Sequence, residues 1–109
     1  MATSNISTLA RRVQQNPQDS FSKFALALEL LKIDEVHKAR LLFESVREYD
    51  PDYVGVYYHL GQVYRRLDDH NHAVDIFRQG ITVASGIGDQ HARKELEEAL
   101  QTTLLELDE

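Results

Sequence analysis

The segment from residue 68 to residue 72 holds the side chains best suited to metal chemistry. Asp68, Asp69, His70 and His72 follow one another closely, and imidazole and carboxylate groups are common ligands of zinc and related metals. Two ligands share one face of a helix when they are three or four positions apart, but these two His residues are only two apart. We therefore predict turn and surface residues here, with no metal site and no cofactor.

Carboxylates for general acid–base catalysis are plentiful, but no nucleophile or oxyanion-stabilising arrangement accompanies them. The 18 Asp and Glu residues fall on the polar faces of predicted helices and in turns. The Gly86-Ile87-Gly88 segment follows a helix and lacks the strand and the Lys-Ser/Thr pair of a phosphate-binding loop. We interpret it as a helix end, with Gly86 as the left-handed cap and Asp89 as the next N-cap. The sequence thus predicts no enzyme.

Composition excludes several further classes of protein. The 109 residues suffice for one domain and contain no Cys, which excludes disulfides and fits a reducing compartment. The formal charge of −6 is concentrated in residues 51–109, with five basic and eleven acidic side chains against seven of each in residues 1–50. This distribution argues against nucleic-acid binding. No secretory signal or membrane-spanning stretch is evident, and we expect a cytoplasmic protein. We also expect a bacterial source.

Two amphipathic helices dominate residues 51–84. Apolar side chains recur every three or four residues in both halves of this stretch, at Tyr53, Tyr57, Leu60 and Tyr64, and then at Ala73, Ile76, Phe77 and Ile81. The polar segment 68–71 between the two helices is so short that the helices must form an antiparallel hairpin. Pro51 and Asp52 are predicted to begin the first helix, because Pro suits the first turn and Asp can cap it.

The spacing of six residues resembles the tetratricopeptide repeat. The family pattern of aromatic, Leu, Gly and Tyr residues followed by Ala and Phe is matched by Tyr57, Leu60, Gly61, Tyr64, Ala73 and Phe77. The resemblance implies an all-α fold, a right-handed superhelix of antiparallel helix hairpins. It also implies a scaffold that binds proteins or peptides.

A second copy of the pattern precedes the first at the repeat length of the family. Pro17 and Pro51 lie 34 residues apart, and Leu26, Ala27, Leu30, Ala39 and Phe43 match the later copy at that offset. Helices are expected near 20–32 and 36–49. The copy departs from the pattern at Lys23, which stands at the position of Tyr57.

About six helices are expected in one domain over residues 1–109. It would comprise an N-terminal capping helix (5–16), repeat 1 (17–50), repeat 2 (51–85) and a C-terminal capping helix (89–107). Capping helices are what a short repeat array needs to shield its terminal apolar faces.

In the family, the first helix of each repeat lines a concave groove, and this implies a set of candidate binding residues. We expect contacts to a protein or peptide from Phe24, Leu28, Tyr58, His59, Gln62, Arg65 and Arg66. Tyr and Arg are enriched where binding energy concentrates. The Lys and Asn residues with which some relatives hold chaperone C-termini are replaced here by Phe24, Leu28 and His59, so that clamp is absent.

The apolar groove positions of repeat 1 leave two alternatives open. Phe and Leu side chains facing water would be costly, so something should cover them. The cover is either the protein itself, through the N-terminal helix or a second subunit, or a partner segment lying in the groove. The alternative function is accordingly that of a structural homo-oligomer whose groove is filled by its own chain.

Overall fold

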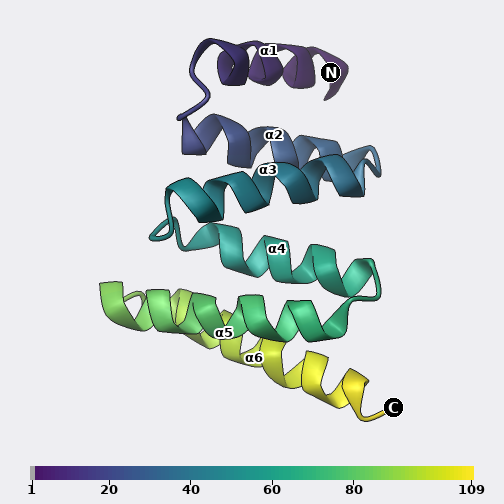
Figure 1. The fold of residues 1–109 in the computed structure, drawn as a ribbon, viewed down its shortest axis with the longest axis vertical. Coiled ribbons are helices and arrows are strands. Elements are labelled where there is room, and N and C mark those ends of the chain that lie inside the picture. Colours follow the sequence, from purple (N-terminus) through teal and green to yellow (C-terminus); the bar gives the residue numbers. More distant parts are fainter. Residues whose placement is uncertain (1) are drawn as a thin grey trace. The chain divides into compact units, whose positions relative to one another are not determined.

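The computed structural model describes residues 2–109, with side chains from residue 5 onward. Over these residues the chain forms six α-helices and no strand, which confirms the all-α prediction (Figure 1). The helices are α1 (Ala2–Gln15), α2 (Ser20–Lys32), α3 (Val36–Tyr49), α4 (Gly55–Arg66), α5 (His70–Ile87) and α6 (Gln90–Leu107). They form two compact units, Met1–Tyr53 and Val54–Glu109. The assignment of one domain with capping helices at both ends stays a prediction.

Unit 1 (Met1–Tyr53) contains α1, α2 and α3, and α2 packs against both of the others. The helices α2 and α3 coincide with the predicted ranges 20–32 and 36–49. Their shared core consists of Leu26, Ala27, Leu30, Ala39, Phe43 and Val46. These are the positions that a 3.6-residue period places on one face of each helix, so apolar burial holds the hairpin together.

Lys23 is buried within this unit, with 6 % of its surface exposed. Its Nζ atom donates a hydrogen bond of 2.9 Å to Ser45 Oγ and lies 5.3 Å from the centre of the Tyr49 ring. A buried ammonium group needs such partners, because the loss of its hydration is otherwise uncompensated. The departure from the repeat pattern is thus accommodated by two side chains of α3.

Unit 2 (Val54–Glu109) contains α4, α5 and α6, and α5 packs against both α4 and α6. The α4–α5 crossing is close because Gly61 has no side chain: a Cβ atom there would lie 2.2 Å from Phe77 Cε1. Gly80 lies on α5 close to both neighbouring helices. A Cβ atom there would lie 2.5 Å from Tyr57 Cβ on α4 and 3.0 Å from Leu96 Cδ1 on α6. Two glycines therefore set how closely the helices of this unit approach.

The same turn joins the helices at three places in the chain. In each turn, a residue with positive φ lies after the end of the preceding helix: Asp34 (φ 65), Asp68 (φ 61) or Gly88 (φ 76). The residue after it is the N-cap of the next helix. In each turn the N-cap N–H donates to a carbonyl five residues earlier, at 2.9, 2.8 and 2.9 Å. This is the hydrogen-bond pattern of a Schellman motif.

Two predicted helix ends are wrong. The helix α4 begins at Gly55 rather than at Pro51 or Asp52, because these two residues form a turn in which Tyr53 N–H donates to the Asp50 carbonyl. The helix α5 continues through Gly86, and Gly88 takes the left-handed conformation. Asp89 is the N-cap of α6, as predicted.

Of the helices in residues 2–109, none combines the length and the apolar character that a membrane crossing requires.

Candidate functional site

The two candidate residues of unit 1 lie on α2 and are partly buried. The ring centre of Phe24 lies 5.7 Å from that of Phe43 and 5.2 Å from that of Tyr53, and Leu28 is also half-buried. The cover of Phe24 therefore includes aromatic rings of its own unit. Phe21, one turn earlier on α2, is 62 % exposed.

The candidates of unit 2 all lie on α4, and three of them line one hollow. Tyr58, Gln62 and Arg65 face Glu95, Glu98, Ala99 and Thr102 of α6 across a space of about 210 Å³. We call this space the α4–α6 hollow. On α6, Leu96, Ala99 and Thr103 are buried. This helix is therefore fixed against its neighbours and presents Glu95, Glu98 and Thr102 to α4.

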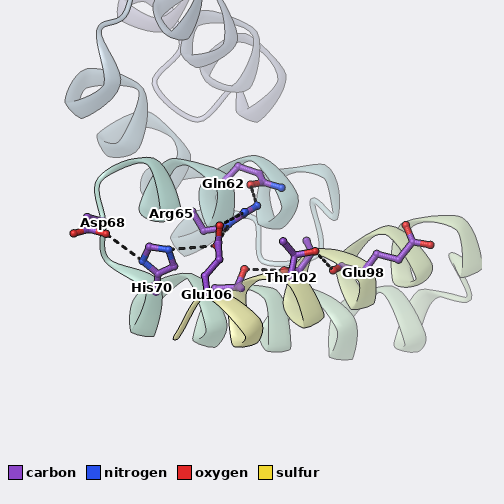
Figure 2. Close-up of polar contacts among 9 residues, drawn as sticks. Gln62, Arg65, Asp68, His70, Glu98, Thr102 and Glu106 are labelled. Atoms are coloured by element: carbon purple, nitrogen blue, oxygen red, sulfur yellow. Dashed lines mark hydrogen bonds and ion pairs between the residues drawn. The ribbon is translucent and has the colours of Figure 1, made fainter. Parts of the chain in front are cut away.

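Arg65 is held by α6 through Glu106 (Figure 2). Its Nε and Nη2 atoms donate to the two carboxylate oxygens of Glu106, both at 2.9 Å, and Nη1 donates to Gln62 Oε1 at 2.7 Å. This fork-to-fork pairing is the strongest geometry for the two groups. The hydrogen bonds from Arg65 lower the pKa of the Glu106 carboxyl, and the same hydrogen bonds raise the pKa of Arg65.

His70 extends this ion-pair network to the α4–α5 turn. Its Nε2 atom lies 3.3 Å from Glu106 Oε1, and its Nδ1 atom lies 3.5 Å from Asp68 Oδ1 (Figure 2). The network thus joins the end of α4, the start of α5 and the last turn of α6. Sequence reasoning did not identify Glu106 as part of the site, because it lies 41 residues from Arg65 and only the packing of α6 brings it there.

Of the two other candidates on α4, His59 lies deeper and Arg66 lies at the surface. The His59 ring stands edge-on to that of Tyr58, with 5.6 Å between centres, and burial lowers the pKa of its imidazole. Arg66 is exposed and lines a second, shallow hollow of about 370 Å³ with Gln62, Arg65 and Glu106. The structure therefore groups Tyr58, Gln62, Arg65 and Arg66 along one side of α4.

The side chains of the His- and Asp-containing turn interact with other residues of the protein. His72 Nδ1 lies 3.2 Å from Asp69 Oδ2, and the His72 ring stacks on Tyr64 at 4.2 Å between centres. Among the side chains that the structure describes, no group of three or more His, Cys, Asp or Glu residues is arranged to hold a metal ion.

Comparison with known families and structures identifies what the chain is similar to. The family model for the tetratricopeptide repeat matches residues 54–86. A tetratricopeptide repeat domain protein from Salinibacter ruber is 48 % identical; its solution structure gives a TM-score of 0.77 over 81 % of this chain and 89 % of that one. A crystal structure of a tetratricopeptide repeat domain protein from the same organism gives 0.75 at 48 % identity, over 78 % and 96 % of the two chains.

A more distant structure shares the fold. The TPR2B domain of yeast Sti1, solved as a complex with pHsp70, gives a TM-score of 0.86 at 14 % identity, over 93 % of this chain and 81 % of that one. A search of curated proteins finds no match.

Proposed function

This chain belongs to the tetratricopeptide repeat family, and we propose that it binds a peptide or protein segment along the side of α4 that faces α6. The fold and its peptide-bound structural neighbours support a protein-interaction module. The observation that carries the proposal for this chain is the α4–α6 hollow, in which an aromatic ring, an amide and charged groups converge. Such a mixture is typical of surfaces that bind polypeptides.

Within this proposal the candidate residues take different roles. Tyr58, Gln62 and Arg66 would contact the ligand directly, and Arg65, held by Glu106, would position Gln62 and the last turn of α6. His59 would support the Tyr58 ring from the side. Phe24 and Leu28 would provide a separate apolar contact in repeat 1.

We further propose that the protein acts without catalysis, in the cytoplasm of a bacterium. The 48 % identity to a protein of Salinibacter ruber supports a bacterial source. The absence of Cys from the sequence fits a reducing compartment.

The test is selection of peptides from a displayed random library on the immobilised protein. We expect selected peptides to lose at least tenfold in affinity for Tyr58→Ala/Arg66→Glu, because this variant removes the ring from the hollow and reverses the charge of Arg66, which would contact the segment outside the hollow. The matched control is Arg78→Glu, at an exposed position of α5. Selected peptides that bind the double variant and the wild type equally would move the site away from α4. Circular dichroism must show that both variants keep their helix content.

Exposure of Phe21 favours homo-oligomerisation through unit 1 as a second candidate function. A ring that is 62 % exposed beside half-buried Phe24 and Leu28 is the kind of surface that a second copy could cover. This candidate predicts a mass that rises with concentration in light scattering, and a monomer for Phe21→Glu. A wild-type protein that stays monomeric at high concentration would exclude it.

A further inference from the structure

The positive charge that lines the α4–α6 hollow is already neutralised within the protein. Three guanidinium nitrogens of Arg65 donate hydrogen bonds, two to Glu106 and one to Gln62, at distances between 2.7 and 2.9 Å. An acidic ligand would have to displace Glu106 and would leave that carboxylate without its partner. The guanidinium of Arg65 is therefore not the group that a ligand meets first.

The remaining charges of the hollow are two carboxylates. Glu95 pairs only loosely with His91, at 3.5 Å between two side chains that are 52 % and 86 % exposed. The carboxylate of Glu98 has no hydrogen-bond or ion-pair partner among the side chains that the structure describes, and in Figure 2 it extends away from the Arg65–Glu106 pair. Both line the hollow together with Tyr58, so the net charge that faces a ligand is negative.

Tyr58 adds a second feature suited to a cation. The face of an aromatic ring attracts ammonium and guanidinium groups, and this attraction adds to that of nearby carboxylates. The hollow of about 210 Å³ is of a size for one extended side chain. The surrounding half of the molecule, residues 51–109, carries eleven acidic and five basic side chains, which would attract a basic segment from a distance.

We propose that the α4–α6 hollow binds a Lys or Arg side chain of the partner segment, between the carboxylates of Glu95 and Glu98 and beside the ring of Tyr58. This inference rests on the proposed function and specifies its ligand as basic. The Arg65–Glu106 pair creates this preference in two ways. It neutralises Arg65, the cation that lines the hollow, and it anchors α6, which carries both carboxylates.

The experiment is a titration of the isotope-labelled full chain, followed by amide NMR shifts, with two capped probes: pentalysine and pentaglutamate. Pentalysine is expected to shift the amides of the lining residues in a saturable way, and pentaglutamate to leave them in place. Glu98→Gln is expected to weaken pentalysine binding about fivefold or more. Glu97→Gln is the matched control, because it removes the same charge from α6 at a residue outside the α4–α6 hollow; its affinity should stay within twofold of the wild type.

Three outcomes would overturn the inference. Equal losses in Glu98→Gln and Glu97→Gln would mean that pentalysine follows only the overall negative charge. Shifts of the lining amides by pentaglutamate alone would mean that the surface binds a peptide of the opposite charge, and the proposed function would stand. No shift with either probe would also reject the basic-ligand inference, and the peptide selection on Tyr58→Ala/Arg66→Glu would then decide the proposed function independently.

Discussion

The two units contain equivalent helix crossings that differ in which helix carries the larger side chain. In unit 2, Tyr57 is 2 % exposed and packs across Gly80, which has no room for a Cβ atom. In unit 1, the position of Tyr57 is taken by Lys23 and that of Gly80 by Val46, both buried. A thinner side chain on the first helix thus accompanies a larger one on the second. A larger residue on one helix of a repeat is thus tolerated where the facing residue is smaller, as Gly80 faces Tyr57 in unit 2.

A second pair of positions shows the same freedom. Gly61 in unit 2 lies against the ring of Phe77, whereas the equivalent Ala27 in unit 1 carries a Cβ atom and is fully buried. Phe43, the equivalent of Phe77, packs its ring near Phe24. At this position the helices of unit 2 therefore leave no space for a Cβ atom, whereas those of unit 1 accommodate one.

The largest predicted effect tests this tolerance. Gly80→Ala should destabilise unit 2 by about 3 kcal/mol, because the new Cβ atom would meet Tyr57 Cβ, which cannot move without its helix. The matched control is Gly86→Ala on the same helix, where a Cβ atom meets nothing within 4 Å; it should stabilise by about 0.5 kcal/mol. Urea denaturation measures both, and equal effects would refute the role of close approach.

The next prediction tests whether the larger Val46 limits the size of the side chain at position 23 of unit 1. Lys23→Tyr should destabilise by about 2 kcal/mol, because Val46 leaves less room than Gly80 leaves for Tyr57. Lys23→Met, which loses the hydrogen bond to Ser45 but keeps an unbranched chain, should cost about 1 kcal/mol.

A double-mutant cycle with Val46→Gly sharpens this prediction. Lys23→Tyr should cost about 1 kcal/mol less in the Val46→Gly background than in the wild type, since the equivalent residues of unit 2, Tyr57 and Gly80, lie against each other. Additive free energies of unfolding in the cycle would show that the volumes at these two positions are independent.

A further prediction concerns the N-caps of α3 and α5, the second helix of each repeat. Glu35 and Asp69 are equivalent, with similar backbone angles (φ −86, ψ 66 and φ −108, ψ 70), but only Asp69 accepts a hydrogen bond from the helix, at 3.2 Å from His72 N. Glu35→Asp should therefore stabilise unit 1, and Asp69→Glu destabilise unit 2, each by about 1 kcal/mol. Reciprocal shifts in the denaturation midpoint are the expected result; shifts of the same sign would contradict it.

Much of the fold could be predicted because it depends on local patterns. The ranges 20–32 and 36–49 follow from apolar periodicity within each helix, and Asp89 was recognisable as a cap from its type and place. The prediction of Gly86 as the left-handed cap is wrong by two residues, because any glycine can adopt positive φ and residue type alone does not distinguish Gly86 from Gly88. The structure shows the rule that decides between them: the left-handed residue directly precedes the N-cap, as Asp34 precedes Glu35.

The candidate site could be predicted only in part, because it depends on contacts between distant segments. Spacing placed Tyr58, Gln62 and Arg65 on one side of α4, and the structure brings them together in one hollow. Spacing carried no information about what α6 would place opposite them. The pairing of Arg65 with Glu106 could therefore not be predicted from spacing.

The burial of Lys23 makes its amine a chemical reporter of unit 1. The side chains of Lys32 and Lys38 are 66 % and 68 % exposed and Lys94 is also exposed, so an amine-reactive reagent would label these three in the folded protein. Lys23 would react only in molecules whose unit 1 has opened. The rate of its labelling, read by mass spectrometry, would give the opening frequency of this unit alone, with the three exposed lysines as an internal standard.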